Sequence, residues 1–460
     1  MRLDFLDRTE ELQRLRRFAE RPGSGLAVVY GRRRCGKTRL IQQAASTGGT
    51  AYYMADDRDA TLQRSALALE IARVLPGFAD VRYREWSALL ERLWREAGDH
   101  FCLIIDELPA LVASARELPS LLQKHLDRPD RRGPKLVLCG SSQHMMHGLA
   151  LDKSAPLYGR AREILKIAPL PAGWIVDAFD RLDATAAVEA LAVWGGIPRY
   201  WELAREYDSL WLAVRDLVLS PLGVLHREPL ALLQDDLREV AQSATVLALI
   251  GSGCHRSSEI AGRMQRPATA LSRPLERLVD LGLVRRDTPF GTSVRDTKRS
   301  LYRIDDPFVR FWFRFVEPAR SRLEARQTDA VVAEIQGAWA GFVAATWEDL
   351  VRASVPHMTF DGRAFGPAAA WWGPGRDRQP MALDVVAEAV DGSAVLVGEA
   401  KWEVASDVGR LAAELSRKAE RLPLVEGRTV VPVIFLRSRP DQVPKGCICL
   451  TPEDVLRTLR

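Results

Sequence analysis

The chain has 460 residues, of which 47% are hydrophobic and 27% are charged, and its formal net charge is +5. This length suits about three domains with ample cores. No run approaches the ~18 apolar residues of a membrane span, and the charged N-terminus has no secretory apolar segment. Six scattered cysteines suit reduced thiols. We therefore expect a cytoplasmic protein with no membrane partner, whose mild positive charge permits nucleic acid as a partner without requiring it.

The first predicted elements are a helix and a buried strand. Thr9 is expected to cap a helix that runs to about Glu20, with acidic residues in its first turn. Residues 27–30 are apolar and β-prone, which is the composition of a strand buried on both faces. This strand leads directly into the chain's most informative motif.

The segment after this strand fits G-x-x-x-x-G-K-[ST] at every fixed position. The glycines allow backbone N–H groups to surround phosphate oxygens, Lys37 can reach the β- and γ-phosphates, and the Thr38 hydroxyl can ligate Mg²⁺. The next helix directs its positive N-terminal end at the phosphates. The pattern predicts a Mg-ATP site; the alternative is a chance glycine-rich basic turn. The predicted binding residues are Gly31, Arg32, Arg33, Arg34, Cys35, Gly36, Lys37, Thr38 and Arg39.

A second acidic signature follows at a suitable distance. Residues 50–54 are predicted as a strand and residues 62–93 as helical, with apolar side chains at three- and four-residue spacing. Five apolar residues then end in Asp106 and Glu107. Asp106 is expected to hold Mg²⁺ through its water shell, and Glu107 to orient or deprotonate the attacking water.

Two later segments add candidates for the same site. Residues 135–142 are predicted as another buried strand, which ends in small hydroxyl residues; a polar strand-end turn is the alternative interpretation. Arg160 and Arg162 follow, and either could complete the site at the transition state, from this subunit or a neighbouring one. A basic surface turn explains these arginines equally well, and the sequence leaves a homo-oligomer open.

This order of motifs resembles the archaeal-type P-loop ATPases of the STAND/AAA+ group. Residues 194–200, WGGIPRY, match the Gly-Gly-x-Pro turn of that family's helical lid. The resemblance implies that Pro198 lies near the base, that Arg199 can reach the phosphates, and that Arg8 belongs to the segment that holds adenine. It also implies that Ser141, with Ser142 as second choice, senses the γ-phosphate. Such proteins often continue into a winged helix and a nuclease-like domain.

The middle of the chain has winged-helix organisation. Apolar helices are predicted at 245–250, from residue 257, and at 268–281, and strands near 282–284 and 300–304 would form the wing. The third helix would enter a major groove, where arginines could contact phosphates or bases. A winged helix used only for protein contacts is the alternative. The candidate DNA-binding residues are Arg266, Arg273 and Arg277.

The last predicted domain carries a pair of facing carboxylates. After a helix at 330–355, a hairpin that turns at Asp391-Gly392 places Asp384 across from Glu399, with Cβ atoms ~5 Å apart. Mg²⁺ or Mn²⁺ could lie between them, and Lys401, on the same strand face as Glu399, could orient water.

The hairpin residues resemble the Asp…Glu-x-Lys pattern of PD-(D/E)XK nucleases. In that family a preceding helix often adds a glutamate, and Glu348 suits this role. A salt bridge of Lys401 with Asp384 or Glu399, or an inactive descendant of a nuclease, would produce the same pattern. The resemblance implies that Asp384, Glu399, Lys401 and Glu348 are catalytic, with the first two as metal ligands.

Together these predictions describe an α/β chain with an AAA+-like P-loop ATPase domain and helical lid, then a winged helix, then a restriction-endonuclease-like domain. The expected boundaries are 1–170, 171–240, 241–315, a linker at 316–335, and 336–460. The expected function is ATP hydrolysis with action on DNA, in which nucleotide state controls a Mg-dependent nuclease-like domain. The alternative is a STAND-type switch whose later domains only bind DNA or a protein partner.

Overall fold

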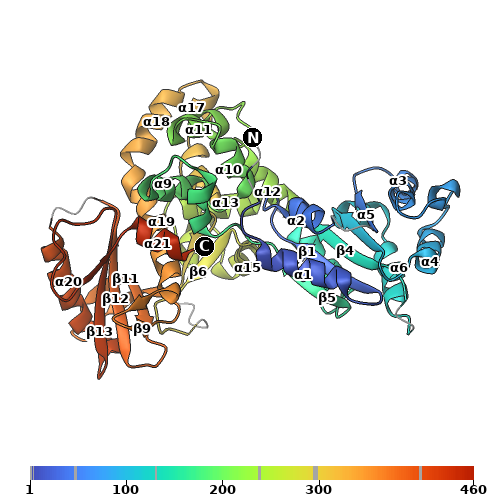
Figure 1. Cartoon of the computed structure of the whole chain (residues 1–460). Coiled ribbons are helices and arrows are strands. Elements are labelled where there is room, and N and C mark those ends of the chain that lie inside the picture. Colours follow the sequence, from blue (N-terminus) through green and yellow to red (C-terminus); the bar gives the residue numbers. More distant parts are fainter. Residues whose placement is uncertain are drawn as a thin grey trace. The chain divides into compact units, whose positions relative to one another are not determined.

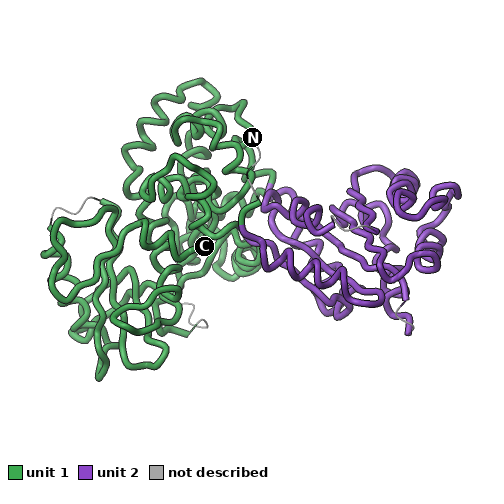
Figure 2. The backbone as a smooth tube through the Cα atoms, in the orientation of Figure 1, with its two compact units in different colours: residues 1–6, 170–231, 239–460 green, residues 7–169, 232–238 purple. Residues whose placement is uncertain are grey.

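The computed structural model describes residues 3, 5–45, 49–129, 132–236, 240–293, 299–403 and 407–460. Figure 1 shows the chain, and Figure 2 its division into two compact units. Residues 7–169 and 232–238 form one unit, which we call the P-loop unit, and residues 1–6, 170–231 and 239–460 form the other, the C-terminal unit. In the described part of the chain, no helix is both long and apolar enough to cross a membrane.

The P-loop unit is built on a five-stranded parallel sheet with the order β2-β3-β4-β1-β5. Every residue of β1, β3 and β4 is buried, as expected for central parallel strands. Its strands are β1 (Gly25–Tyr30), β2 (Thr50–Met54), β3 (Cys102–Asp106), β4 (Lys135–Gly140) and β5 (Ala161–Lys166). The strand predictions for this part of the chain are thereby confirmed.

Helices flank the strands of this unit in the sequence. They are α1 (Thr9–Glu20), α2 (Lys37–Ala44), α3 (Ala60–Ala72), η1 (Phe78–Asp80), α4 (Trp86–Glu96), α5 (Leu108–Ser114), α6 (Leu118–Leu126), α7 (Gln143–Met146) and η2 (His147–Leu151). The single helical stretch predicted at 62–93 is wrong, because α3 and α4 are separate helices. α3 ends at Ala72, and Pro76 and Gly77 follow before η1, where Gly77 adopts a left-handed conformation at φ +84.

The C-terminal unit begins with short helices and a three-helix arrangement closed by a two-stranded ribbon. The first helices are η3 (Ala172–Trp174), α8 (Ile175–Ala178), α9 (Ala184–Trp194), α10 (Pro198–Ala204), α11 (Leu210–Val214), η4 (Arg215–Leu219) and α12 (Glu228–Asp236), whose end belongs to the P-loop unit. There follow α13 (Val240–Gly251), α14 (Ser257–Arg263), η5 (Ala268–Leu271), α15 (Ser272–Asp280) and the antiparallel strands β6 (Val284–Asp287) and β7 (Leu301–Ile304).

The segment expected to be a linker, 316–335, is largely helical. The aromatic run before it forms α16 (Pro307–Phe311) and η6 (Trp312–Val316), and then come α17 (Arg320–Glu324), α18 (Thr328–Gly337) and α19 (Trp339–Ser354). Phe308, Phe311 and Trp312 are fully buried, and Phe342 packs edge-to-face on Phe311 with ring centroids 5.8 Å apart. Within the segment itself, Leu323, Val331 and Ile335 are buried, so it packs as part of the unit.

The second sheet has five strands in the order β10-β11-β12-β13-β14. β10 (Ala369–Pro374), β11 (Pro380–Glu388) and β12 (Ala394–Lys401) are antiparallel neighbours, whereas β13 (Thr429–Leu436) and β14 (Ile448–Leu450) continue in parallel. Short elements complete it: η7 (Val355–His357), β8 (Thr359–Phe360), β9 (Arg363–Ala364), α20 (Val408–Arg421), η8 (Pro423–Val425) and α21 (Pro452–Thr458). Three segments predicted as separate domains, 171–240, 241–315 and 336–460, thus lie in one compact unit apart from 232–238.

Candidate functional site

The loop between β1 and α2 has a backbone that requires its glycines. Gly31 adopts φ +149, and a Cβ atom there would lie 2.3 Å from the carbonyl oxygen of Ile167. Gly36, at φ +89, has open space where a Cβ would project. The first glycine therefore permits close approach to β5, and the second supplies the left-handed turn that begins α2.

The polar side chain of Thr38 in the motif meets the end of β3. The Thr38 hydroxyl donates to Asp106 Oδ2 at 2.8 Å, and the Tyr52 hydroxyl donates to the same oxygen at 2.9 Å. Lys37 is 5% exposed, and its Nζ donates to the carbonyl oxygen of Arg32 at 3.0 Å. Asp106 is fully buried and is held by neutral donors, which a cation can replace without competing against a fixed positive charge. Its carboxylate and the Thr38 hydroxyl therefore fit the oxygen ligands that Mg²⁺ prefers.

Tyr52 is a site residue that the sequence analysis missed. Burial, followed by the charge of Asp106 and the hydrogen bond to it, raises the pKa of the Tyr52 hydroxyl well above its usual range. The phenol thus stays protonated and donates to Asp106. The only signal in the sequence is the position of this tyrosine in the predicted strand TAYYM. In the structure this strand pairs with β3, and Tyr52 lies opposite Ile104.

Glu107 directly follows Asp106 in a strained backbone conformation, at φ +52 and ψ +47. The Ser141 hydroxyl donates to Glu107 Oε1, and the Ser141 backbone N–H donates to Glu107 Oε2 at 3.3 Å. Two donors at the end of β4 therefore orient the carboxylate predicted to activate water. Ser142 instead donates to Asp236 Oδ1 at 3.0 Å, and burial raises the pKa of that aspartate.

The arginines predicted for the nucleotide have diverse partners. Arg8, which is 6% exposed, pairs with Glu11 at 3.0 Å and donates to the carbonyl oxygen of Ala168. Arg33 pairs with Asp235 at 3.3 Å. The charges of Arg32, Lys37 and Arg8 all oppose the rise that burial gives to the pKa of the Cys35 thiol, so all three lie near the loop.

Arg160 does not lie free to act as a catalytic charge. Its Nε and one terminal nitrogen donate to the two carboxylate oxygens of Asp127 at 2.8 and 2.7 Å. Its other terminal nitrogen donates to the carbonyl oxygens of Pro156 and Tyr158, both at 3.0 Å. This arrangement is the surface basic turn that was the alternative interpretation of Arg160. Its assignment to catalysis stays a prediction.

Pro198 and Arg199 belong to the C-terminal unit. Pro198 is the first residue of α10, where its fixed φ suits the start of a helix, and Arg199 pairs with Glu202 at 3.1 Å. Gly195 adopts φ +55 just before this turn, and its carbonyl oxygen accepts a hydrogen bond from Trp201 Nε1 at 2.7 Å. Their roles toward a nucleotide stay predictions.

A second cluster of charged side chains lies in the C-terminal unit, where β11 and β12 pair. Val385 faces Gly398, so the register predicted for this hairpin is confirmed, and Asp384 and Glu399 are the next facing positions. The loop, however, is four residues long rather than two, since Ala389 N–H donates to the carbonyl oxygen of Ala394. The Ala400 N–H donates to Asp384 Oδ2 at 3.0 Å, which fixes this carboxylate beside β12.

Two ammonium groups neutralise the carboxylates of this second cluster. Lys401 Nζ lies 2.7 Å from Glu399 Oε2 and 3.5 Å from Asp384 Oδ2, and Lys418 Nζ lies 2.5 Å from Glu399 Oε1. Burial opposes the charge of Lys401, but Asp384 and Glu399 outweigh it and raise the pKa of this lysine. Sequence analysis missed Lys418, because it lies 19 residues after Glu399 and only the packing of helix α20 brings it to the strand.

Glu348 and Arg352, on successive turns of α19, complete this carboxylate–lysine cluster. Burial and then the charge of Asp384 raise the pKa of Glu348, and burial and Asp384 likewise raise the pKa of Glu399. Arg352 donates to the carbonyl oxygen of Asp384 at 3.0 Å and pairs with Glu348 at 3.4 Å. The four predicted residues of this cluster therefore lie together. Within the described ranges, no group of three or more His, Cys, Asp or Glu side chains is arranged to hold a metal ion.

The candidate DNA-binding helix is α15. Leu275 and Leu278 are buried in it, whereas Arg273 and Arg277 are exposed. Arg266 is exposed in the turn that precedes η5. The predicted third helix is thus two elements, because η5 is a 3-10 turn that leads into α15.

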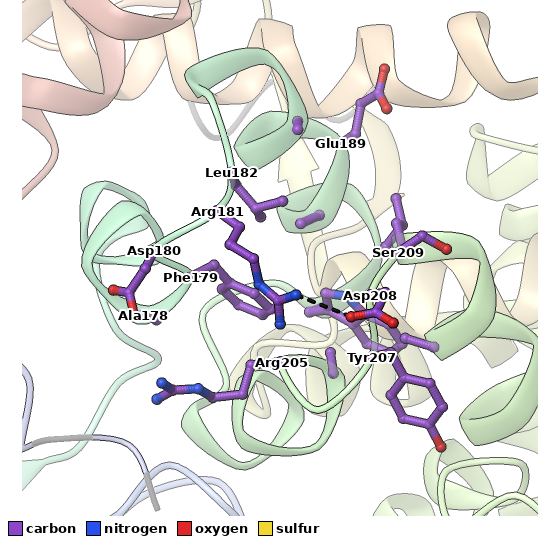
Figure 3. Close-up of a pocket in the computed structure, with 16 residues that line it drawn as sticks. Ala178, Phe179, Asp180, Arg181, Leu182, Glu189, Arg205, Tyr207, Asp208 and Ser209 are labelled. Carbon is purple, nitrogen blue, oxygen red and sulfur yellow. Dashed lines mark hydrogen bonds and ion pairs between the residues drawn. The ribbon is translucent and has the colours of Figure 1, made fainter. Parts of the chain in front are cut away.

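Figure 3 shows a pocket of about 240 Å³ among the helices at the start of the C-terminal unit. Its wall combines aromatic groups, such as Phe179 and Tyr207, with charged side chains of both signs. Arg181 pairs with Asp208 at 3.0 Å, and both side chains are largely exposed. This balance of charges gives no preference for an anionic or a cationic ligand.

Comparison with known proteins finds similarity to two families. Residues 5–202 match a family described as an ATPase domain found predominantly in Archaea, and residues 312–412 match a family of archaeal and bacterial proteins of unknown function. The chain is 26% identical over 426 residues to the uncharacterized protein MJECL04 of Methanocaldococcus jannaschii. This alignment covers 91% of this chain and 93% of that protein.

The fold of a solved ATPase is also similar. The Walker-type ATPase PABY2304 of Pyrococcus abyssi superposes with a TM-score of 0.51 at 19% identity, covering 68% of this chain and 96% of that one. Residues 5–202 are therefore similar to an archaeal ATPase domain family, and the α/β fold with a parallel sheet predicted for the N-terminal part is confirmed.

Proposed function

We propose that the chain hydrolyses ATP at the junction of the P-loop with the end of β3. The observation that carries this proposal is the 2.8 Å hydrogen bond between Thr38 and Asp106, with Glu107 next in the chain and Lys37 on the same loop. In a P-loop ATPase these are the groups that bind Mg-ATP and promote attack by water.

Each residue has a distinct part in this proposal. Lys37 exchanges the Arg32 carbonyl for phosphate oxygens, and backbone N–H groups of the loop and of the start of α2 donate to the same phosphates. Thr38 and Asp106 would hold Mg²⁺, which when bound would offset charge on the phosphates. Glu107 accepts a proton from the attacking water, while Ser141 keeps its carboxylate in position and senses the γ-phosphate.

Two variants test the assignment. Lys37→Ala is expected to abolish binding of a fluorescent ATP analogue, because the charge that faces the phosphates is lost. Glu107→Gln is expected to keep binding but to lose turnover, measured as phosphate release. Normal hydrolysis by Lys37→Ala would contradict the proposal, and Glu96→Gln, exposed at the end of α4, is the matched control for the second change.

The ATPase is further proposed to act on DNA through the arrangement of α13, α14, α15 and the ribbon β6–β7. Three helices followed by a two-stranded ribbon have the element order of a winged helix, and the exposed arginines of α15 suit phosphate contacts. The alternative is a switch in which this part contacts only a protein. Binding of labelled duplex DNA with and without ATP distinguishes these proposals.

A second candidate function, metal-dependent DNA cleavage, is favoured by the position of Asp384 opposite Glu399 with Lys401 alongside. Asp384 and Glu399 would supply two oxygen ligands to Mg²⁺ or Mn²⁺, and waters or DNA phosphates would have to complete the shell. Lys401 and Lys418 already neutralise these carboxylates, which equally suits the inactive scaffold. Incubation with DNA and Mg²⁺ or Mn²⁺, with and without ATP, decides between the two, and absence of cleavage would favour the scaffold.

A further inference from the structure

A pocket of about 440 Å³ lies in the C-terminal unit, and none of Asp384, Glu399, Lys401 and Lys418 lines it. Its wall is formed by the end of α13, β7, the aromatic segment α16–η6 and the first turns of α19. This volume is in the range of small-molecule sites. None of the functions proposed above uses it.

The ionisable side chains that line this pocket are all basic. Arg303, Arg310 and Arg314 line it together with His255, and no Asp or Glu is among its described lining residues. Arg303 pairs with Asp287 at 3.3 Å and Arg310 with Asp349 at 3.3 Å, so two of the arginines are held from behind by carboxylates outside the wall. No described carboxylate pairs with Arg314, which is exposed and lies 6.0 Å from the ring of Phe315.

Arg310 has an unused donor beside this pocket. One terminal nitrogen donates to Asp349, and the other donates to the Thr346 hydroxyl at 2.5 Å. Its Nε is buried and has no hydrogen-bond acceptor among the described residues. The positive guanidinium itself lines the pocket, where it would attract an anionic group.

The start of α19 adds backbone donors on the same wall. Ala338, the N-cap of this 16-residue helix, lines the pocket together with Gly341 and Ala345. Positions spaced by three and four residues share one helix face. A Cβ at Gly341 would meet no atom within 4 Å, so this small-residue face leaves room for a ligand beside the positive end of the helix.

We propose that this pocket binds a phosphate group carried by a nucleotide-sized ligand, with Arg310, Arg314 and the first turn of α19 as the phosphate site. Arginine is suited to phosphate because its planar donors match the oxygen geometry. The rings of Phe315 and Phe342, 5.1 Å apart, supply apolar surface for the rest of the ligand. A free nucleotide and the terminal phosphate of a DNA strand both present this chemistry.

The test uses the full chain carrying Lys37→Ala, which silences the P-loop. Isothermal titration calorimetry with adenosine 5′-monophosphate, and with adenosine as the probe that lacks phosphate, measures the dependence on phosphate. Arg314→Ala is expected to weaken binding of the monophosphate about tenfold, the value of one charged hydrogen bond. Arg320→Ala, an exposed change of the same charge in α17, is expected to leave it unchanged.

A second variant blocks the pocket without removing charge. Gly341→Leu fills the space beside α19 and is expected to abolish binding of the monophosphate; leucine also favours a helix interior more than glycine does, so the fold should persist. Gly262→Leu, at another helical glycine with open space, is the size control. Unaltered binding by Gly341→Leu, or equal binding of adenosine and its monophosphate, would overturn the proposal.

The two sources of phosphate are separated by a 5′-phosphorylated oligonucleotide and its 5′-hydroxyl counterpart, compared by fluorescence anisotropy. Preference for the phosphorylated strand that Gly341→Leu removes would assign the pocket to DNA ends. Binding of the monophosphate alone would assign it to a free nucleotide. If neither probe shows binding that depends on phosphate, the pocket is not a phosphate site, and this result is independent of whether Lys37→Ala retains ATP hydrolysis.

Discussion

The two carboxylate sites of this protein differ in what neutralises their charge. In the P-loop unit, Asp106 accepts hydrogen bonds from the neutral hydroxyls of Thr38 and Tyr52, while Lys37 is occupied by a backbone carbonyl. In the C-terminal unit, Glu399 lies between the ammonium groups of Lys401 and Lys418. A divalent cation can join Asp106 by displacing weak neutral contacts, whereas at Glu399 it must compete with two fixed cations. The P-loop site is therefore the better prepared for a metal.

The largest expected effect is a difference in DNA cleavage between variants of the two lysines of the carboxylate–lysine cluster. If the cluster cleaves DNA, Lys401→Ala should lower Mn²⁺-dependent cleavage by at least about 100-fold, since Lys401 faces both carboxylates and would orient the water. Lys418→Ala removes only a contact to Glu399 and should leave cleavage within about tenfold.

Plasmid cleavage measures these rates, with Asp384→Ala as the inactive reference. Equal loss in both lysine variants would assign the two lysines a common structural role. In every variant ATP hydrolysis should be unchanged, because the cluster belongs to the other unit.

A second test removes the carboxylate that supports the carboxylate–lysine cluster. Asp349 accepts hydrogen bonds from Arg285 at 2.6 Å and Arg352 at 2.6 Å and pairs with Arg310. Asp349→Asn should lower the free energy of unfolding by about 3 kcal/mol at pH 7, because Arg285, Arg310 and Arg352 each lose one carboxylate partner. Urea denaturation followed by tryptophan fluorescence measures it.

The difference in free energy of unfolding between wild type and Asp349→Asn should depend on pH in one direction. Burial disfavours the charge of Asp349, but the arginines outweigh it and hold its pKa below the usual range. Its stabilising effect is therefore complete above about pH 4, the usual aspartate pKa, and is lost as the pH falls through the lowered value. The gap between wild type and Asp349→Asn should shrink on acidification. Asp361→Asn, at an exposed ion pair, should change stability by less than about 0.5 kcal/mol.

The backbone of the P-loop gives a third test that involves no charge. Gly31→Ala places a Cβ 2.3 Å from the Ile167 carbonyl oxygen, whereas Gly36→Ala meets no neighbour. We expect Gly31→Ala to destabilise the P-loop unit by about 2 kcal/mol, from crowding and a positive φ. Gly36→Ala should cost about 1 kcal/mol, from the positive φ alone. Thermal unfolding measures both, and a larger effect at Gly36 would contradict this order.

The smallest expected effect concerns α15. Replacing Arg273 and Arg277 with alanine should weaken DNA binding several-fold and reduce the salt slope of the binding constant by about 2, since each phosphate contact releases about one counterion. Fluorescence anisotropy at several salt concentrations measures this slope. An unchanged slope would exclude this helix as a phosphate-binding surface, and Arg320→Ala is the matched control.

The sequence predicted the P-loop unit well because its signals are local. The motif from Gly31 to Thr38, the apolar strand that ends in Asp106, and the strand at 135–140 each follow from a short run of residues with a definite spacing. The hairpin register of β11 and β12 was also predictable, since alternate residues of paired strands keep a fixed relation once the turn is located.

The wrong predictions of helix and linker bounds arose where the local pattern of apolar residues does not show where a helix ends or begins. The apolar spacing at 62–93 continues across Pro76 and Gly77, yet these two residues separate α3 from α4. The charged stretch at 316–335 reads as a linker, but the aromatic side chains before and after it pack together and retain it as helix.

By itself, the sequence determined the loop between β1 and α2 and which strand positions of the hairpin face one another, because both depend on spacing along the chain. Only the tertiary structure decided which charges meet. Tyr52 reaches Asp106 across 54 positions, Lys418 reaches Glu399 across 19, and Arg160 is held by Asp127. Such contacts depend on how strands and helices pack, and the strength of a charge interaction depends on distance and burial, neither of which is encoded by residue spacing.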